Sequence, residues 1–208
     1  MNKPLLRGLY AITDERLMTE KNFLFKAEQA LLGGASLIQY RDKSGDKEKR
    51  LHQATALKQL CEQHAVLLII NDDIELAHAV QAHGVHLGKE DASIRQARQQ
   101  LGPDAIIGVS CYDQLDLALA AEKAGADYVA FGAFFVSPTK PEARTASLEL
   151  LTTATQQLHI PICTIGGITA ANASTLVESG ADMTAVISDL FFGDDIRTTA
   201  SHIARLFS

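Results

Sequence analysis

Short apolar segments alternate with alanine-rich segments along almost the whole chain, and this alternation limits the fold more than any other feature. The apolar segments are rich in β-branched or aliphatic residues and end in a polar residue, as buried strands do. Eight of them cover residues 9–13, 37–41, 66–71, 84–87, 105–110, 128–132, 162–166 and 184–188. The segments between them predict amphipathic helices over 23–32, 47–64, 74–81, 93–101, 114–124, 148–157 and 171–179.

A glycine-led tetrapeptide recurs where predicted helices pass into strands. It reads GASL at 34–37, GADY at 125–128 and GADM at 180–183, with a looser copy beginning at Gly84. Glycine tolerates the left-handed backbone that often ends a helix. The repeat therefore marks turns from helix to strand.

The pattern predicts one (β/α)8 TIM barrel domain over residues 1–208. Continuous apolar runs such as VLLII at 66–70 are typical of parallel strands covered on both faces. Eight alternating units favour a closed barrel over an open doubly wound sheet. The 208 residues give 208/8 = 26 residues per unit, which is short for a fold that usually needs about 200 to 250 residues.

Composition excludes several classes of partner. The net charge is −6, from 19 basic and 25 acidic residues, which argues against nucleic acid. The longest aliphatic run, Ala65 to Ile70, is far shorter than the roughly 18 residues of a membrane span. Cys61, Cys111 and Cys163 lie far apart and form no metal or disulfide motif. We expect a cytoplasmic protein that acts on small molecules, and we leave open whether it forms a homo-oligomer.

Charged residues follow several of the predicted strands. Active sites of such barrels lie at the carboxyl ends of the strands. Three cations, Arg41, Lys43 and Lys140, and two carboxylates, Asp72 and Asp91, stand there. Together they suit a diphosphate that carries Mg²⁺, because this ion prefers one or two carboxylates plus phosphate oxygens and water. The alternative is that they form ordinary salt bridges with one another.

A second anion site is predicted after the last two strands. Gly166 and Gly167 follow the seventh strand, and Ile187 and Ser188 follow the eighth, where barrels often bind phosphate through backbone N–H groups. A plain tight turn is the alternative. The loop at 138–141, PTKP, could close over a ligand, although these residues taken alone favour a proline-stiffened connection.

No covalent nucleophile stands out. Ser110 lacks a GxSxG context, and Cys111 has no histidine partner evident in the sequence. His78, His83 and His86 span a helix end and a strand, so positions on the helix surface or in the core are favoured over a zinc site. The polar groups would instead stabilise a leaving anion by charge and position.

At these loops the chain resembles the thiamine phosphate synthase family over nearly its whole length. The matching motifs are LYAITD at 9–14, IQYRDK at 38–43, LIIND at 68–72, GVHLGKED at 84–91, IGVS at 107–110, SPTK at 137–140, IGGI at 165–168 and AVIS at 185–188. The resemblance implies a (β/α)8 barrel that joins 4-amino-2-methyl-5-(diphosphooxymethyl)pyrimidine to a carboxythiazole phosphate. The products are thiamine phosphate, diphosphate and CO₂. The pyrimidine-methyl cation left by the diphosphate is captured by the thiazole nitrogen.

The resemblance also implies roles for individual residues. The pyrimidine diphosphate would contact Gln39, Tyr40, Arg41, Asp42, Lys43, Asn71, Ser110 and Lys140, of which Arg41, Lys43, Ser110 and Lys140 would be catalytic. Asp72 and Asp91 would bind Mg²⁺. The thiazole phosphate would contact Ser137, Pro138, Thr139, Gly167, Ile187 and Ser188.

Some positions depart from the usual family pattern. Asp73 replaces a frequent arginine and adds a negative charge that either alters metal affinity or faces solvent. Tyr40, Asp42, Lys89 and Val136 are milder departures. Two other functions remain as alternatives, a related thiazole tautomerase and a non-catalytic thiazole phosphate binder. Neither needs the diphosphate and metal residues, so their retention favours the synthase.

Overall fold

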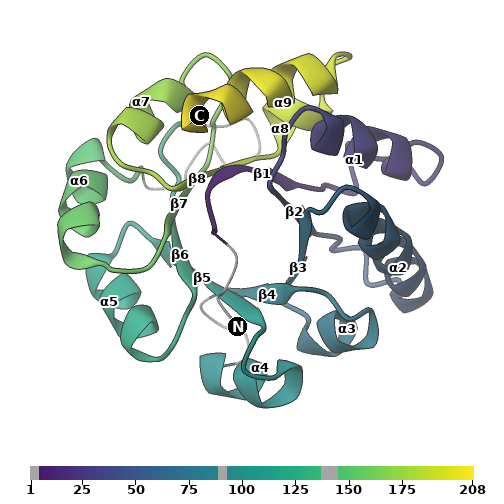
Figure 1. Ribbon diagram of the computed structural model, residues 1–208, viewed down its shortest axis with the longest axis horizontal. Coiled ribbons are helices and arrows are strands. Elements are labelled where there is room, and N and C mark those ends of the chain that lie inside the picture. Colours follow the sequence, from purple (N-terminus) through teal and green to yellow (C-terminus); the bar gives the residue numbers. More distant parts are fainter. Residues whose placement is uncertain (1–4, 89–92, 137–144) are drawn as a thin grey trace.

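A computed structural model describes residues 5–88, 93–136 and 145–208, which form a closed eight-stranded barrel (Figure 1). The strands are β1 (Gly8–Ile12), β2 (Leu37–Tyr40), β3 (Leu67–Asn71), β4 (Gly84–Leu87), β5 (Ile106–Tyr112), β6 (Tyr128–Phe131), β7 (Ile162–Ile165) and β8 (Met183–Val186). Each strand pairs in parallel with the next, and β8 closes the ring by pairing with β1. The predicted (β/α)8 fold is confirmed.

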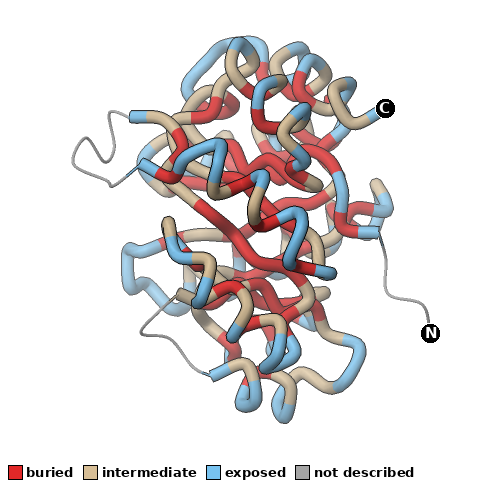
Figure 2. Tube along the Cα trace, turned by 90° about the vertical axis from the view of Figure 1, so that its left-hand side faces the viewer, coloured by how far each residue is buried: buried red, intermediate tan, exposed pale blue. Residues whose placement is uncertain are grey.

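Helices surround the barrel on the outside (Figure 1). They are α1 (Phe23–Leu32), α2 (Lys47–Gln63), α3 (Ile74–Ala79), α4 (Ile94–Leu101), α5 (Leu115–Lys123), α6 (Leu148–Gln157), α7 (Ala173–Glu178), α8 (Ser188–Phe191) and α9 (Ile196–Ala204), followed by the 3-10 turn η1 (Arg205–Phe207). Figure 2 shows buried segments through the middle of the molecule and exposed backbone on its outer side.

Every predicted strand and helix is present, with bounds that differ by a few residues. The sequence prediction missed α8 and α9. The apolar side of α9 consists of Ile196, Ala200 and Ile203, which are all buried. Their spacing is helical, and a (β/α)8 barrel has a helix after its eighth strand, so α9 was predictable from the sequence.

Alternate strand residues fill the inside of the barrel, so that it is a packed core and not a pore. The residues buried in this inner cluster are Leu6, Tyr10, Ile12, Leu37, Ile69, Ile106, Tyr128, Ala130, Cys163, Met183 and Ala185. The outward-facing residues pack against the helices in a larger second cluster. The inner cluster includes two tyrosines, whose hydroxyl groups need buried partners.

The tetrapeptide repeat has a structural function at the amino-terminal ends of the strands. Its glycines take φ angles between 92° and 99°. Asp127 Oδ2 accepts a hydrogen bond of 2.8 Å from the Ile107 amide, and Asp182 Oδ2 accepts one of 2.9 Å from the Ile162 amide. Each aspartate thus follows a helix end and ties its own strand to the preceding one.

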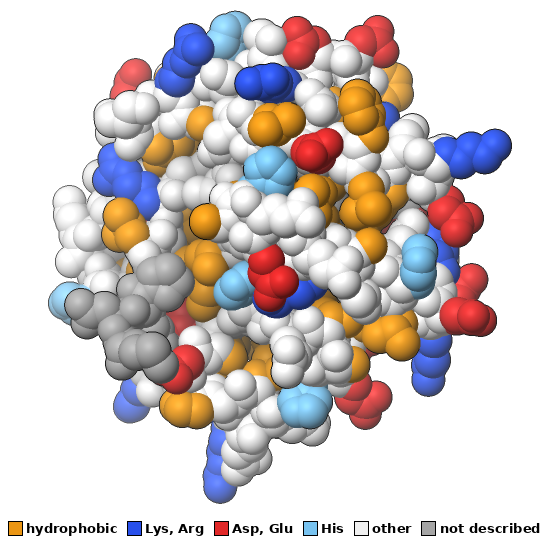
Figure 3. Space-filling model, turned by 45° about the vertical axis from the view of Figure 1, so that its right-hand side comes forward, with side chains coloured by type: hydrophobic (Ala, Val, Ile, Leu, Met, Phe, Trp, Pro, Cys, Tyr) orange, Lys and Arg blue, Asp and Glu red, His pale blue; other side chains and the backbone are white. Residues whose placement is uncertain are grey.

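The molecular surface carries both signs of charge. Figure 3 shows basic and acidic side chains interspersed on the face that it displays. Within the part of the chain that the structure describes, no helix combines the length and the apolar character that crossing a membrane requires.

Candidate functional site

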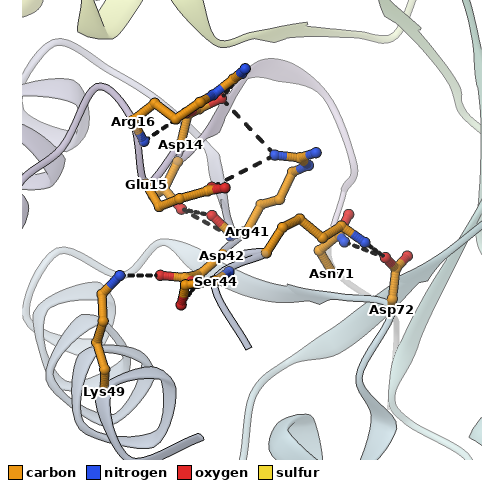
Figure 4. A network of polar contacts seen from close by, with 11 residues as sticks. Asp14, Glu15, Arg16, Arg41, Asp42, Ser44, Lys49, Asn71 and Asp72 are labelled. Carbon is orange, nitrogen blue, oxygen red and sulfur yellow. Dashed lines mark hydrogen bonds and ion pairs between the residues drawn. The ribbon is translucent and has the colours of Figure 1, made fainter. Parts of the chain in front are cut away.

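The carboxyl ends of β1, β2 and β3 bring together a network of charged and polar side chains (Figure 4). Asp14 and Glu15 come from the loop after β1, Arg41 and Asp42 from the loop after β2, and Asn71 is the last residue of β3. Because neighbouring parallel strands end at the same side of the barrel, loops distant in sequence meet there.

Arg41 lies between two carboxylates of the first loop. Its Nη1 atom is 4.0 Å from Asp14 Oδ2 and 3.8 Å from Glu15 Oε2. Arg16 donates two hydrogen bonds of 2.9 and 2.6 Å to the Asp14 carboxylate and is the main reason why the pKa of Asp14 is lowered. The Arg41 side chain keeps 28% of its surface exposed. It is therefore positioned by protein charges and still accessible to an anion.

Lys43 and Asp72 form an ion pair across the ends of β2 and β3. The Asn71 side-chain amide also donates a hydrogen bond of 2.6 Å to Asp72 Oδ2. The alternative of salt bridges at the rim is thus partly correct, since this predicted cation and carboxylate do pair. The pairing also places a cation and a carboxylate side by side at the ends of β2 and β3.

A cleft of about 480 Å³ opens beside this ion pair. Asp42, Lys43, Asn71 and Asp72 line one part of it, and Gln96 on α4 lines another. Asp72 supplies the hard oxygen ligand that Mg²⁺ prefers, and the polar lining suits its hydration shell. The described residues hold no group of three or more His, Cys, Asp or Glu arranged around a metal position. A single Asp72 carboxylate beside a polar cleft is compatible with Mg²⁺, which usually takes only one or two carboxylates from the protein.

The side chains of Tyr40 and Asp42 point away from the barrel mouth. The Tyr40 hydroxyl donates to Gln53 Oε1 at 3.0 Å, and Lys49 Nζ donates to Asp42 Oδ2 at 2.6 Å. Burial opposes ionisation of Asp42, but the hydrogen bonds from Lys49 and Ser44 outweigh it, so the pKa of Asp42 is lowered. The Tyr40 and Asp42 side chains are thus engaged by α2, although Asp42 also lines the cleft.

Both carboxylate oxygens of Asp73 have structural partners at the start of α3. Its Oδ1 atom accepts a hydrogen bond of 2.8 Å from the Leu76 amide and so caps the helix. Its Oδ2 atom accepts one of 2.8 Å from Arg50 Nη2. The unusual aspartate at this position thus has two structural partners, which accounts for its extra charge.

The loop after β7 and the start of α8 form a second polar region. Gly166 and Gly167 take φ angles of 101° and 63°. A Cβ atom at Gly167 would lie 2.5 Å from the Phe135 carbonyl oxygen, so only glycine fits. The Asn172 side chain donates to the Gly167 carbonyl at 3.1 Å. Ser188 begins α8 directly after Ile187. The backbone here can approach a phosphate closely.

Gln39 and Ser110 are the ends of a buried hydrogen-bond chain. Gln39 bonds to Tyr10, Tyr10 to Tyr128, Tyr128 to His86, and His86 to Ser110. Burial lowers the pKa of His86 to about 4, so the imidazole is neutral near neutral pH. Sequence reasoning missed Tyr10, His86 and Tyr128 as members of the site. Their signal is a polar residue at an inward-facing strand position, where apolar residues predominate.

The three cysteines are buried and free. Burial raises the pKa of the Cys61 and Cys111 thiols to about 12, so neither is a thiolate nucleophile. Tyr112, next to Cys111 at the end of β5, is 43% exposed and has a φ angle of 54°. Cys111 packs in the core, whereas Tyr112 reaches the surface on the side of the barrel where the site lies.

Several predicted site residues lie outside the described residues. These are Asp91, Ser137, Pro138, Thr139 and Lys140, together with the rest of the segment 138–141. Val136, just before that segment, is 71% exposed. The described part of the site therefore consists of the ends of β1 to β5 and of β7 and β8.

These features define a (β/α)8 barrel that gathers charged and polar groups at the carboxyl ends of its strands, where enzymes of this fold carry their active sites. The sequence profile described as thiamine monophosphate synthase matches residues 9–190. The chain belongs to this family.

Similar proteins match almost the whole chain. This chain is 52% identical over 202 residues to the thiamine-phosphate synthase of Thioalkalivibrio sulfidiphilus, and the match covers 97% of this chain and 96% of the relative. It is 53% identical over 201 residues to that of Thiobacillus denitrificans, covering 97% and 95%. The solved structure of thiamine phosphate pyrophosphorylase from Pyrococcus furiosus superposes with a TM-score of 0.88 at 36% identity, covering 98% of this chain and 96% of that one.

Proposed function

We propose that this protein synthesises thiamine phosphate from 4-amino-2-methyl-5-(diphosphooxymethyl)pyrimidine and a carboxythiazole phosphate, releasing diphosphate and CO₂. The observation that carries the proposal is the grouping of Arg41, Lys43 and Asp72 at one barrel mouth. Family membership and the activity named for the relatives support it.

The cations act on the departing diphosphate. Arg41, held by Asp14 and Glu15, and Lys43, beside Asp72, stabilise the negative charge that grows on the leaving group. Lys140 and Ser110 contribute further contacts to it. Asp72 and Asp91 would hold Mg²⁺, which would supply additional positive charge for the leaving diphosphate. Because the cation formed on the pyrimidine is captured by the thiazole nitrogen, no protein nucleophile is required.

The thiazole phosphate occupies the region between β7 and α8 in this proposal. Gly167, Ile187 and Ser188 present backbone groups there, and Ser137, Pro138 and Thr139 contribute from the loop after β6. Since β7, β8, β1, β2 and β3 are consecutive neighbours in the barrel, the two anion sites flank β1. A pyrimidine held by Gln39, Asn71 and Ser110 would lie between them, with both phosphate groups directed outward.

The test is a turnover assay with both purified substrates, with and without Mg²⁺. We expect thiamine phosphate and diphosphate in equal amounts, loss of product after chelation, and recovery when Mg²⁺ is restored. No product with both substrates and Mg²⁺ would contradict the synthase function. Isomerised thiazole in place of product would identify a tautomerase, and binding without either reaction a thiazole phosphate binder.

The proposed reaction needs small-molecule substrates and no nucleic-acid or membrane partner. We also propose that the protein works in the cytoplasm. Its three cysteines are free in the structure, which fits a reducing compartment.

A further inference from the structure

Four hydrogen bonds cross the inside of the barrel from β2 to β5. Gln39 Nε2 lies 2.8 Å from the Tyr10 hydroxyl, and the two tyrosine hydroxyls of Tyr10 and Tyr128 are 2.9 Å apart. His86 Nδ1 lies 2.9 Å from the Tyr128 hydroxyl, and His86 Nε2 lies 2.9 Å from Ser110 Oγ. The chain therefore connects two residues that the proposed function places against the pyrimidine.

The inner members of the chain are shut off from water. Tyr128 is fully buried, Tyr10 is 1% exposed and His86 is 8% exposed. The Tyr128 ring also stacks on the His86 imidazole, with centroids 5.5 Å apart. A buried hydroxyl that loses its protein partner has no water to replace it, so each bond depends on its neighbours.

The chain has a direction because each hydroxyl carries only one proton. The Gln39 amide nitrogen donates to Tyr10. We infer that Tyr10 then directs its own proton to Tyr128 and that Tyr128 donates to His86 Nδ1, since this arrangement uses each hydroxyl proton once within the chain. Both ring nitrogens of His86 face hydroxyl oxygens and not carboxylates. A neutral imidazole that accepts at Nδ1 carries its proton at Nε2. His86 then donates to Ser110, which leaves the Ser110 hydroxyl proton available for another acceptor.

We propose that Tyr10, Tyr128 and His86 are positioning residues that fix Gln39 as a hydrogen-bond acceptor and Ser110 as a donor, and so select an aminopyrimidine. This inference rests on the proposed function, which supplies a pyrimidine with a 4-amino group. The amino group donates to the Gln39 amide oxygen, while Ser110 donates to a substrate nitrogen or oxygen.

An oxo group in place of the amino group would set an acceptor against the Gln39 oxygen. Turning the Gln39 amide over would relieve this clash, but Tyr10 and Tyr128 would then have to reverse and His86 would have to move its proton to Nδ1. We call this chain from Gln39 through Tyr10, Tyr128 and His86 to Ser110 the relay. Because of the relay, turning over the Gln39 amide requires four hydrogen bonds and one histidine tautomer to change together. A site with fixed polarity rejects a mispaired analogue more strongly than a site whose groups rotate freely.

The first experiment measures the relay without any substrate. Nitrogen-15 histidine NMR of the full chain near neutral pH should show His86 as the Nε2–H tautomer, with its signals identified by their loss in His86→Gln. In Tyr128→Phe, which keeps the ring, the chain is cut and both tautomers should appear. An Nδ1–H tautomer in the wild type, or an unchanged His86 spectrum in Tyr128→Phe, would overturn the proposal.

The second experiment compares kcat/KM for the 4-amino and 4-oxo pyrimidine diphosphates. We expect the preference for the amino compound to fall about tenfold or more in Tyr10→Phe and Tyr128→Phe, while KM for the thiazole phosphate stays unchanged. Thr184→Val is the matched control. It removes a buried hydroxyl that bonds to Thr164 at 3.3 Å elsewhere in the same sheet, and it should keep the wild-type preference.

An unchanged preference in both tyrosine variants, or an equal loss in Thr184→Val, would contradict the relay. Two tyrosine variants keep the test usable if one of them fails to fold. A wild-type enzyme that turns over neither pyrimidine would contradict the proposed function instead. The NMR measurement would still report on the relay in that case.

Discussion

Two carboxylates hold the Arg41 guanidinium at the barrel mouth. Their contacts of 4.0 and 3.8 Å to Arg41 are loose, whereas Arg16 binds Asp14 through two short hydrogen bonds. Arg16 therefore satisfies much of the Asp14 charge, and Arg41 remains available to a substrate anion. The same pair of acidic residues keeps the cation in place before the substrate binds, which lowers the entropy lost on binding.

Replacing Arg41 with Gln should lower kcat/KM for the pyrimidine diphosphate about 100-fold, because one cation that stabilises the leaving group is lost. The free energy of unfolding should change by less than about 1 kcal/mol, as for other partly exposed ion pairs. Steady-state kinetics and urea unfolding measure the two effects. Arg205→Gln, in the turn η1 at the end of the chain, is the control. Equal kinetic losses in both variants would contradict a specific role for Arg41.

His86 makes the stability of the barrel depend on pH. Burial lowers its pKa from an ordinary value of 6.5 to about 4. Between these values the unfolded chain binds a proton that the folded chain does not. The free energy of unfolding should therefore fall as the pH drops from 6.5 to about 4, by an amount of the order of 3 kcal/mol. Urea unfolding at several pH values should show this slope in the wild type and a shallower one in His86→Gln. Identical slopes would mean that His86 is not held neutral.

The meeting of the charged residues at the barrel mouth was predictable from the sequence. The hydrogen-bond chain buried inside the barrel was not. Lys43 and Asp72 each follow a strand, and a parallel barrel brings strand ends together, so their meeting follows from the strand pattern. The bond between Tyr10 and Tyr128 joins residues that are 118 positions apart and depends on the width of the barrel interior. Tyr40 could have been interpreted better, because strand alternation puts it opposite in direction to Gln39.

The loop after β7 packs closely against the loop after β6. The Phe134 amide donates to the Ile165 carbonyl at 3.1 Å, and the Phe135 amide donates to the Gly166 carbonyl at 3.0 Å. The glycines therefore allow two loops to pack closely, and they also keep the backbone accessible. Both properties depend on the absence of a Cβ atom.

Gly167→Ala should raise KM for the thiazole phosphate about tenfold or more and leave KM for the pyrimidine diphosphate nearly unchanged. The new Cβ would lie 2.5 Å from the Phe135 carbonyl oxygen and would require a left-handed alanine, which costs roughly 1–2 kcal/mol before any clash. Kinetics with each substrate varied in turn measures the effect. Gly45→Ala is the control, since Gly45 also has a positive φ but no atom within 4 Å of its Cβ position. A comparable rise in both variants would point to backbone strain alone.

Strands and helices were predicted well because each unit has its own apolar periodicity. The short helix α8 escaped prediction since four residues are too few to show a period, and its sequence, SDLF, is polar at the start. Its position is set by packing, with Leu190 and Phe191 buried. Asp189 also accepts a hydrogen bond of 2.8 Å from the Ala170 amide of the loop after β7. Such long-range contacts leave no local pattern in the sequence.

The two ends of the barrel have different functions, with structural contacts at the amino-terminal ends of the strands and the candidate site at their carboxyl ends. Asp127 and Asp182 join strands at the amino-terminal end, whereas Arg41, Lys43 and Asp72 lie at the carboxyl end. This division is general for barrels of this fold, in which the lower face serves stability. Eight repeated units in the sequence favoured a closed barrel, whereas the closure itself and the hydrogen bonds of the aspartates required the structure.

Asp182→Ala should lower the free energy of unfolding by about 1–3 kcal/mol, because the Ile162 amide loses a partly buried acceptor at 2.9 Å. The value of kcat/KM for both substrates should stay unchanged. Asp182→Asn keeps an acceptor oxygen and should recover most of the stability. Urea unfolding and steady-state kinetics of the wild type, Asp182→Ala and Asp182→Asn measure the two effects. A loss of activity in Asp182→Ala without a loss of stability would contradict the division between the two ends.

The pairing of β1 with β8 also affects how the protein can be made on a ribosome. Strand β8 begins at Met183, so β1 has no partner on that side until all eight strands have been synthesised. Until then the nascent sheet has two open edges, β1 and its most recent strand, which can pair with other chains. Folding of this barrel during translation therefore ends with its final strand, and transcripts truncated before that point should yield aggregation-prone fragments.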